Sequence, residues 1–112
     1  MKLEELCEKL QLRVITDQPD LDKEVTFACC SDILSDVMTK SCKGCLWITN
    51  LAHENVLAIS FFRELAGVIL AGGLVPQQEV VDKANEKNLL LLSTPLSAFE
   101  ICGRLYQMGI RG

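Results

Sequence analysis

From residue 45 onward, short apolar runs alternate with longer segments whose apolar residues recur at helical spacing. The apolar runs predict three strands, at Cys45 to Thr49, Val68 to Leu70 and Leu89 to Leu92. The segments that follow them predict helices at about 54–65, 77–87 and 95–108. Strands that are apolar on both faces and separated by helices are typical of a parallel or mixed sheet with helices on both faces. This alternation predicts an α/β fold.

The first 30 residues extend the same pattern. An apolar stripe at positions i, i+3, i+4 and i+7 predicts an amphipathic helix, and its residues are Leu3, Leu6, Cys7 and Leu10. Strands are predicted at 13–16 and 25–29, with a turn at 17–20. The 112-residue chain has no linker or low-complexity segment. We therefore expect a single compact domain over residues 1–112, with a mostly parallel sheet and helices on both faces.

Two of the predicted helices have capping signals at their starts. Ser31 is a suitable N-cap for a helix that ends near residue 39, with Asp32 in its first turn to complement the helix dipole. The last helix has two alternative starts. It begins either with Pro95 at the first helical position, or at the capping box of Ser97 and Glu100.

Charge and hydropathy exclude two classes of partner. The net charge is −4 at pH 7, whereas nucleic acids and anionic membranes attract proteins with a cationic face. The longest apolar run, Leu89 to Leu92, is too short to span a bilayer. Acidic residues interrupt the apolar positions at the start of the chain, unlike in a signal peptide. We therefore expect a cytoplasmic protein whose six cysteines are mainly reduced thiols.

Gly72 and Gly73 follow a predicted strand and precede a predicted helix, as the glycines of many phosphate-binding loops do. A Walker loop requires Lys and then Ser or Thr after its last glycine, but Leu74 follows here. The three spaced glycines of a dinucleotide fingerprint are also missing. We therefore interpret the pair first as a turn with positive φ. The alternative is an anion contact at the start of the next helix.

Cys42 and Cys45 form a CxxC motif before a predicted strand. Such a motif is either a redox couple or half of a metal site. Cys29 and Cys30 would supply the other half, but we expect the intervening helix to separate the two pairs by about 13 Å. A thioredoxin-like CxxC motif opens a helix rather than a strand. We therefore interpret these cysteines as structural, with a thiol or metal sensor through Cys42 and Cys45 as an alternative.

The carboxyl ends of the predicted parallel strands should meet at one edge of the sheet, where open α/β sheets bind ligands. His53, the only histidine, follows one of these strands. No nucleophile with a base and an orienting acid can be assembled around it, so we expect no catalytic site. The residues expected to line a ligand crevice at this edge are Asn50, His53, Gly72, Gly73, Ser93 and Thr94.

Four segments of the sequence, in order, resemble the DRTGG domain family. They are Ser31 to Met38, Leu46 to Thr49, the Gly72–Gly73 turn with Pro76, and Leu92 to Glu100. The resemblance covers nearly the whole chain. Members of the family are fused to CBS-domain pyrophosphatases, to phosphotransacetylases and to proteins similar to HPr kinase. Others are small separate proteins, some of them encoded beside iron-only hydrogenases.

The resemblance implies a regulatory or protein-interaction domain that has no catalytic activity and requires no cofactor. It also implies self-association, so we expect a homodimer, with a partner protein in a hydrogenase or metabolic regulatory context. The apolar stripe of the first helix is one candidate for the interface between protomers. The other is the last helix, with Phe99, Cys102, Leu105 and Tyr106. Core packing within one chain explains these residues equally well.

The chain departs from the family pattern at two points that matter for ligand binding. The family has an Asp-Arg pair after the strand that ends here at Thr49, but this chain has Asn50 and Leu51. The family also has a threonine where Ala71 precedes the two glycines. An anion site built on the family pattern would therefore keep only backbone amides. A sensor of small ligands, nucleotides or anions, remains the alternative function.

Overall fold

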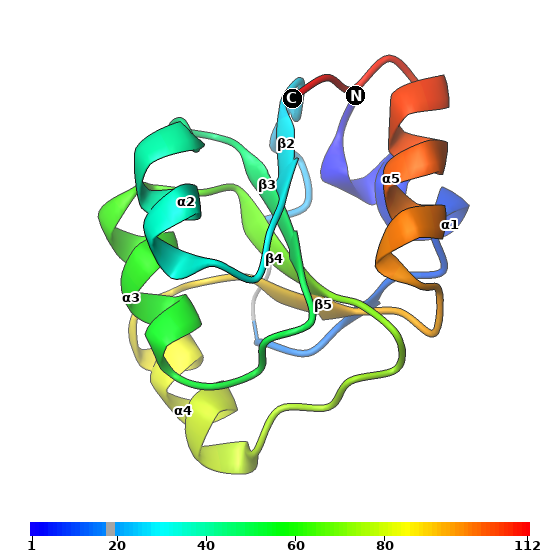
Figure 1. Ribbon diagram of the computed structural model, residues 1–112. Helices are drawn as coiled ribbons and strands as arrows, with labels where there is room; N and C mark the ends of the chain where they lie inside the picture. Colours follow the sequence, from blue (N-terminus) through cyan, green and yellow to red (C-terminus); the bar gives the residue numbers. More distant parts are fainter. Residues whose placement is uncertain (18–19) are drawn as a thin grey trace.

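The computed structural model describes residues 1–17 and 20–112, in which a five-stranded sheet lies between two layers of helices (Figure 1). The strands are β1 (Arg13–Val14), β2 (Ala28–Cys30), β3 (Leu46–Thr49), β4 (Gly67–Leu70) and β5 (Leu91–Ser93). Their order across the sheet is β1-β5-β4-β3-β2. Strands β2 to β5 are parallel, and β1 pairs with β5 in the antiparallel direction. The predicted α/β fold with a mostly parallel sheet is confirmed.

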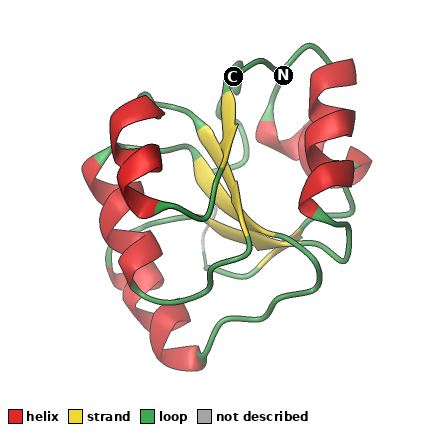
Figure 2. Cartoon of the chain, in the orientation of Figure 1, coloured by secondary structure: helices red, strands yellow, loops and turns green. Residues whose placement is uncertain are grey.

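Helices cover both faces of the sheet (Figure 2). The helices α1 (Leu3–Lys9) and α5 (Ala98–Gln107) lie on one face, and α2 (Leu34–Lys40), α3 (Asn55–Phe62) and α4 (Gln78–Glu86) lie on the other. Successive side chains of a strand point to opposite faces. Ile48 of β3 therefore enters the core beneath α1 and α5, whereas its neighbour Trp47 enters the core beneath the other three helices. This alternation explains why every residue of β3 is buried.

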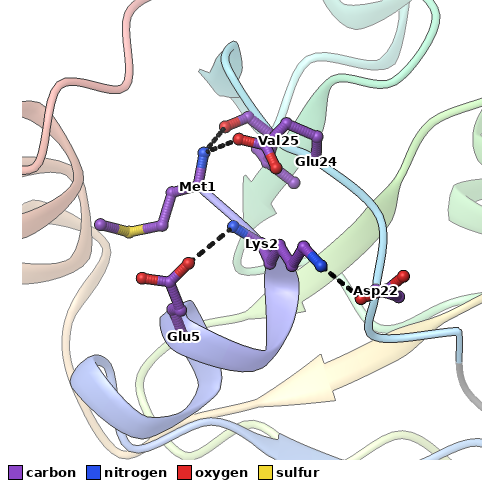
Figure 3. A network of polar contacts seen from close by, with 6 residues as sticks. All are labelled: Met1, Lys2, Glu5, Asp22, Glu24 and Val25. Atoms are coloured by element: carbon purple, nitrogen blue, oxygen red, sulfur yellow. Dashed lines mark hydrogen bonds and ion pairs between the residues drawn. The ribbon is translucent and has the colours of Figure 1, made fainter.

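Helix α1 is joined to the segment before β2 by polar contacts (Figure 3). Lys2 Nζ forms an ion pair with Asp22 at 2.7 Å, and the Met1 amine donates to Glu24 at 2.6 Å. Both pairs include an exposed carboxylate, Asp22 or Glu24, and exposed ion pairs contribute only about 0–1 kcal/mol each. The apolar stripe of α1 contributes more, because Leu3, Leu6 and Leu10 are fully buried in the core of this chain.

Helix α2 begins at Leu34, later than the sequence predicts. Ser31 does not act as its N-cap, because the Ser31 hydroxyl accepts a hydrogen bond from the amide of Ile33 at 3.0 Å, within the loop before the helix. Asp32 is consequently not in the first turn of α2. Its carboxylate instead contacts the end of β3. The prediction of a helix start at this point was wrong because a serine can cap a local turn as readily as a helix.

Helix α5 begins with Ser97 as its N-cap. The Ser97 hydroxyl accepts a hydrogen bond from the Glu100 amide at 3.2 Å, so the alternative start at Ser97 is correct and the start at Pro95 is wrong. The predicted turn at 17–20 includes residues 18 and 19, which lie outside the described residues. Within the described ranges, every helix is too short or too polar to cross a membrane.

Candidate functional site

The four parallel strands end at one edge of the sheet, which we call the carboxyl edge. Asn50, Ala71 and Thr94 directly follow β3, β4 and β5 at this edge. The antiparallel strand β1 starts here, and Arg13 pairs with Ser93. The strand ends therefore converge as the sequence predicts. The side chains of the six predicted ligand residues do not, however, all face one crevice.

The Asp32 carboxylate binds the end of β3. Asp32 Oδ1 accepts hydrogen bonds from Thr49 Oγ1 at 2.7 Å and from the Asn50 amide at 2.8 Å. Asp32 Oδ2 accepts a longer one from Asn50 Nδ2 at 3.4 Å. The bond from the Asn50 amide, helped by those from the two side chains, holds the pKa of Asp32 below its ordinary value. This part of the carboxyl edge therefore carries a fixed negative charge, which disfavours an anionic ligand.

Gly72 and Gly73 form the turn that leaves β4, and both have the positive φ that the sequence predicts, +68° and +75°. Their amides are already bonded within the protein. The Gly72 amide donates to the carbonyl oxygen of Leu96 at 2.8 Å, and the Gly73 amide donates to that of Thr94 at 2.9 Å. These amides join the loops after β4 and β5. They are consequently not available to bind a phosphate.

Thr94 and His53 lie away from each other. Thr94 is 2% exposed, and its hydroxyl donates to the carbonyl oxygen of Leu10 at 2.9 Å, so the hydroxyl faces the interior. His53 is exposed in the loop before α3, where its carbonyl oxygen accepts a hydrogen bond from the Val56 amide at 3.1 Å. Asn50 lies beside the glycine turn, because a Cβ added at Gly72 would be 3.9 Å from Asn50 Oδ1.

A cavity of about 350 Å³ opens at the other end of the carboxyl edge, between β1, β5 and α4. We call it the edge cavity. Ser93 is the one predicted ligand residue among those that line it. Its polar lining consists of Arg13, Asp17, Gln78, Asp82, Asn85 and Ser93. The edge cavity thus combines one cationic group, two carboxylates and several neutral hydrogen-bonding groups.

Two hydrogen bonds order the wall of the edge cavity. Asn85 Oδ1 accepts from the Asp17 amide at 2.7 Å, and Gln78 Nε2 donates to Asp82 Oδ1 at 2.9 Å. Arg13 forms no ion pair with any residue in the described ranges. Its guanidinium therefore remains able to bind an anion. The first turn of α4, which contains Gln78, adds the positive end of a helix dipole.

Sequence reasoning did not include Arg13 in the site. The sequence predicts that Arg13 lies in a strand. It does not predict which strand pairs with it, because that strand, β5, lies some 80 residues later in the chain. Hydrophobic periodicity predicts that a strand exists and leaves its partner open. One signal could have identified Arg13 as a site residue. It is an isolated arginine at the start of a predicted strand whose other residues are apolar or uncharged.

A larger cavity, a groove of about 760 Å³, lies at the opposite edge of the sheet. Phe61 and Phe62 of α3 line it and are 57% and 72% exposed. Lys43 and Glu64, also in the lining, pair with each other at 3.8 Å. The buried Ser60 hydroxyl has no hydrogen-bond partner within the described part of the chain. The exposed lining of the groove is mainly apolar, and its charged residues are Lys23, Glu24, Lys43 and Glu64.

The cysteines are arranged differently from the prediction. Strand β2 lies beside β3 with Ala28 opposite Leu46, and Cys29, Cys42 and Cys45 line one cavity. The predicted separation is wrong because α2 runs back along the sheet and returns the chain to the start of β3. Across residues 1–17 and 20–112, no group of three or more His, Cys, Asp or Glu side chains is arranged to hold a metal ion.

Comparison with known proteins places this fold in a family. No protein of curated function matches the chain by sequence. Among solved structures, the CBS and DRTGG domains of the regulatory region of Clostridium perfringens pyrophosphatase, complexed with the activator diadenosine tetraphosphate, have a similar fold. The TM-score is 0.76 at 15% identity, over 97% of this chain and 47% of that one. The model of the DRTGG domain matches residues 5–108, and the chain therefore belongs to the DRTGG domain family.

Proposed function

We propose that this chain is a non-enzymatic, cytoplasmic regulatory domain that binds a nucleotide in the edge cavity. The observation that carries the proposal is the position of Arg13, a cation beside the Ser93 hydroxyl and the first turn of α4. Guanidinium groups and helix N-termini are the groups that proteins most often use to bind phosphate. The negative charge of Asp32 directs an anion away from the other end of the same edge.

The two carboxylates of the edge cavity favour a nucleotide over inorganic phosphate. Asp17 and Asp82 are hydrogen-bond acceptors. They repel inorganic phosphate, because all of its negative charge would lie inside the cavity with them. A nucleotide places its phosphate at Arg13 and offers ribose hydroxyl and base amino groups as donors to the carboxylates. Acidic residues bind ribose hydroxyls in this way in other α/β sheets. A volume of about 350 Å³ lies within the range of small-ligand sites.

The comparison with the pyrophosphatase supports the same class of ligand. The related DRTGG domain belongs to a regulatory region whose structure contains diadenosine tetraphosphate as an activator. That region is about twice as long as this chain. We extend only the ligand class to this chain, and we assign the ligand to the edge cavity on the basis of its own residues.

A thermal-shift screen of the purified protein tests the proposal. The panel contains ATP, AMP, diadenosine tetraphosphate and inorganic phosphate, each without added metal. A ligand that binds only the folded state stabilises it by RT ln(1 + [L]/Kd), so the unfolding midpoint rises with the logarithm of the ligand concentration once that concentration exceeds Kd. We expect at least one of the adenine nucleotides to raise the midpoint more than phosphate does. A panel without any nucleotide-dependent shift at millimolar concentration would contradict the proposal.

We further propose that the domain self-associates through the exposed face of α5. Leu105 is 2% exposed and packs within its own chain, whereas Phe99 and Tyr106 are 82% and 62% exposed. Phe99 and Tyr106 are seven residues apart, so they lie on the same face of the helix. Two exposed aromatic residues on one helix face are typical of a protein-interaction surface. The stripe of α1 is not available for this role because it is buried in the core.

Substitution of Phe99 by glutamate is expected to shift the protein toward the monomer, because the variant places a charge in an apolar interface. Sedimentation velocity over a range of concentrations measures the effect. The matched control is Phe62→Glu, which adds the same charge at a similarly exposed aromatic residue on α3. Equal sedimentation of the wild type and both variants would contradict self-association through α5.

A further inference from the structure

Five of the six cysteines gather around β2, the edge strand of the sheet. Cys29 contacts Cys45 on the side of α2, and Cys45 in turn contacts Cys42. Cys30 also lines a cavity beside α5, together with Cys102 of that helix. All six are free thiols. The CxxC motif is thus part of a larger thiol cluster, formed by Cys29, Cys42 and Cys45.

The backbone holds Cys42 and Cys45 at a distance suited to a disulfide. The Cys45 amide donates to the carbonyl oxygen of Cys42 at 3.0 Å, and Gly44 supplies the positive φ of +82° at the third position of the turn. Residues at the two ends of such a turn have Cα atoms less than about 7 Å apart. A disulfide typically requires Cα atoms about 4.4–6.8 Å apart. The turn is therefore already close to the geometry of the oxidised pair.

The two thiols differ in their access to solvent. Cys42 is exposed, whereas Cys45 is only 2% exposed. Both line a cavity of about 460 Å³ together with Cys29. A hydrogen bond from the Cys29 thiol, helped by bonds from Cys42, lowers the pKa of Cys45 to about 7. Cys45 therefore loses its proton more readily than an ordinary cysteine does, and the thiolate is the form that reacts with a disulfide.

We propose that Cys42 and Cys45 form a reversible disulfide by exchange with a small-molecule disulfide. The exposed Cys42 thiolate attacks one sulfur of the incoming disulfide, whose S–S bond breaks and releases the first thiolate. The Cys45 thiolate then attacks Cys42 Sγ, breaks the mixed disulfide and releases the second thiolate. The two released thiolates take up the protons that Cys42 and Cys45 lost. The protein pair is oxidised by two electrons, and the small disulfide is reduced by two.

The other thiols are less suited to this reaction. Cys29 and Cys45 are diagonal neighbours on adjacent strands, because the register pairs Cys29 with Trp47. With strands about 4.8 Å apart and a rise of about 3.3 Å per residue, an offset of two residues places their Cα atoms about 8 Å apart, which is beyond the range of an unstrained disulfide. Burial and a hydrogen bond to Cys102 raise the pKa of Cys30 to about 12. Cys30 consequently stays protonated at neutral pH.

Oxidised glutathione is the probe that tests the proposal. The reduced full-length protein is incubated with it at neutral pH, the remaining thiols are alkylated, and the protein is digested with trypsin without reduction. Trypsin cleaves after Lys40, Lys43 and Arg63, so Cys42 and Cys45 fall in different peptides. We expect peptide 41–43 to stay linked to peptide 44–63. A link from 44–63 to peptide 24–40, which contains Cys29, would overturn the assignment, as would the absence of any link.

Two variants separate the roles of the thiols. Cys45→Ser should accumulate a glutathione adduct on Cys42, because no second thiolate displaces it. Cys42→Ser should remain largely unmodified at Cys45, which is buried. Cys7→Ser, on α1, is the matched control and should still form the Cys42–Cys45 link. Circular dichroism confirms that each variant is folded before the reaction. A Cys45→Ser protein that is not modified at Cys42 would contradict the order of the two steps.

Discussion

Replacement of Trp47 by alanine is expected to lower the free energy of unfolding by about 3–5 kcal/mol. Trp47 is fully buried at the centre of β3, beneath the helices α2, α3 and α4. Truncation removes the largest side chain in this core and leaves a cavity that the packed neighbours fill only in part. It also leaves the carbonyl oxygen of Ser31 without its bond from Trp47 Nε1, which measures 2.9 Å. Urea denaturation followed by circular dichroism measures the change.

Two further substitutions divide this effect into its parts. Trp47→Phe keeps most of the apolar volume but loses the hydrogen bond to Ser31. We therefore expect it to lower the free energy of unfolding by less than Trp47→Ala does. Phe62→Ala, on α3, is the control. Phe62 is 72% exposed, and its truncation should change the free energy of unfolding by less than about 0.5 kcal/mol. Similar losses for Trp47→Ala and Phe62→Ala would contradict the position of Trp47 in the core.

Substitution of Gly72 by valine is expected to lower the free energy of unfolding by about 1–3 kcal/mol. Gly72 has a φ of +68°, a conformation in which a β-branched residue is strained. A shift of the backbone to relieve this strain would also lengthen the bond from the Gly72 amide to the Leu96 carbonyl oxygen, now 2.8 Å. That bond joins the loops after β4 and β5. The midpoint of urea denaturation measures the loss.

Two substitutions show whether backbone conformation is the cause. Gly72→Asn should be less destabilising than Gly72→Val, because asparagine tolerates positive φ better. Gly103→Val is the control in α5. Apart from its chain neighbours and the backbone of α5 itself, no atom in the described part of the chain lies within 4 Å of a Cβ added at Gly103, and valine is no worse than glycine in a helix. A Gly72→Val protein as stable as Gly103→Val would contradict the role of Gly72 as a backbone element.

The periodicity of the sequence was sufficient to predict the sheet and its helices. Strand β3 was predicted from its apolar run, because a central parallel strand is buried on both faces. The start of α2 was not predicted correctly, because the Ser31 hydroxyl accepts a hydrogen bond from the Ile33 amide in the loop before the helix. Short-range capping signals compete with one another, and only the folded chain decides between them.

The candidate site was predicted only in part, because its contacts join distant segments. The positive φ of Gly72 and Gly73 followed from the sequence. The hydrogen bonds from their amides to the carbonyl oxygens of Leu96 and Thr94 could not be predicted, since they depend on how the loops after β4 and β5 meet. Arg13 was missed for the same reason, as its pairing with Ser93 joins the two ends of the chain. The backbone conformation of single residues could therefore be predicted from the sequence, whereas contacts between distant segments could not.

The central claim, that a nucleotide binds at Arg13, is tested most directly by isothermal titration of ATP and of diadenosine tetraphosphate into the wild type and Arg13→Gln. Loss of a charge-assisted hydrogen bond of about 1.5–3 kcal/mol should weaken binding roughly 10- to 150-fold. Lys9→Gln, on α1 across the sheet, removes the same charge and should bind as the wild type does. Equal affinities of Arg13→Gln and the wild type, or no binding to either, would contradict the account.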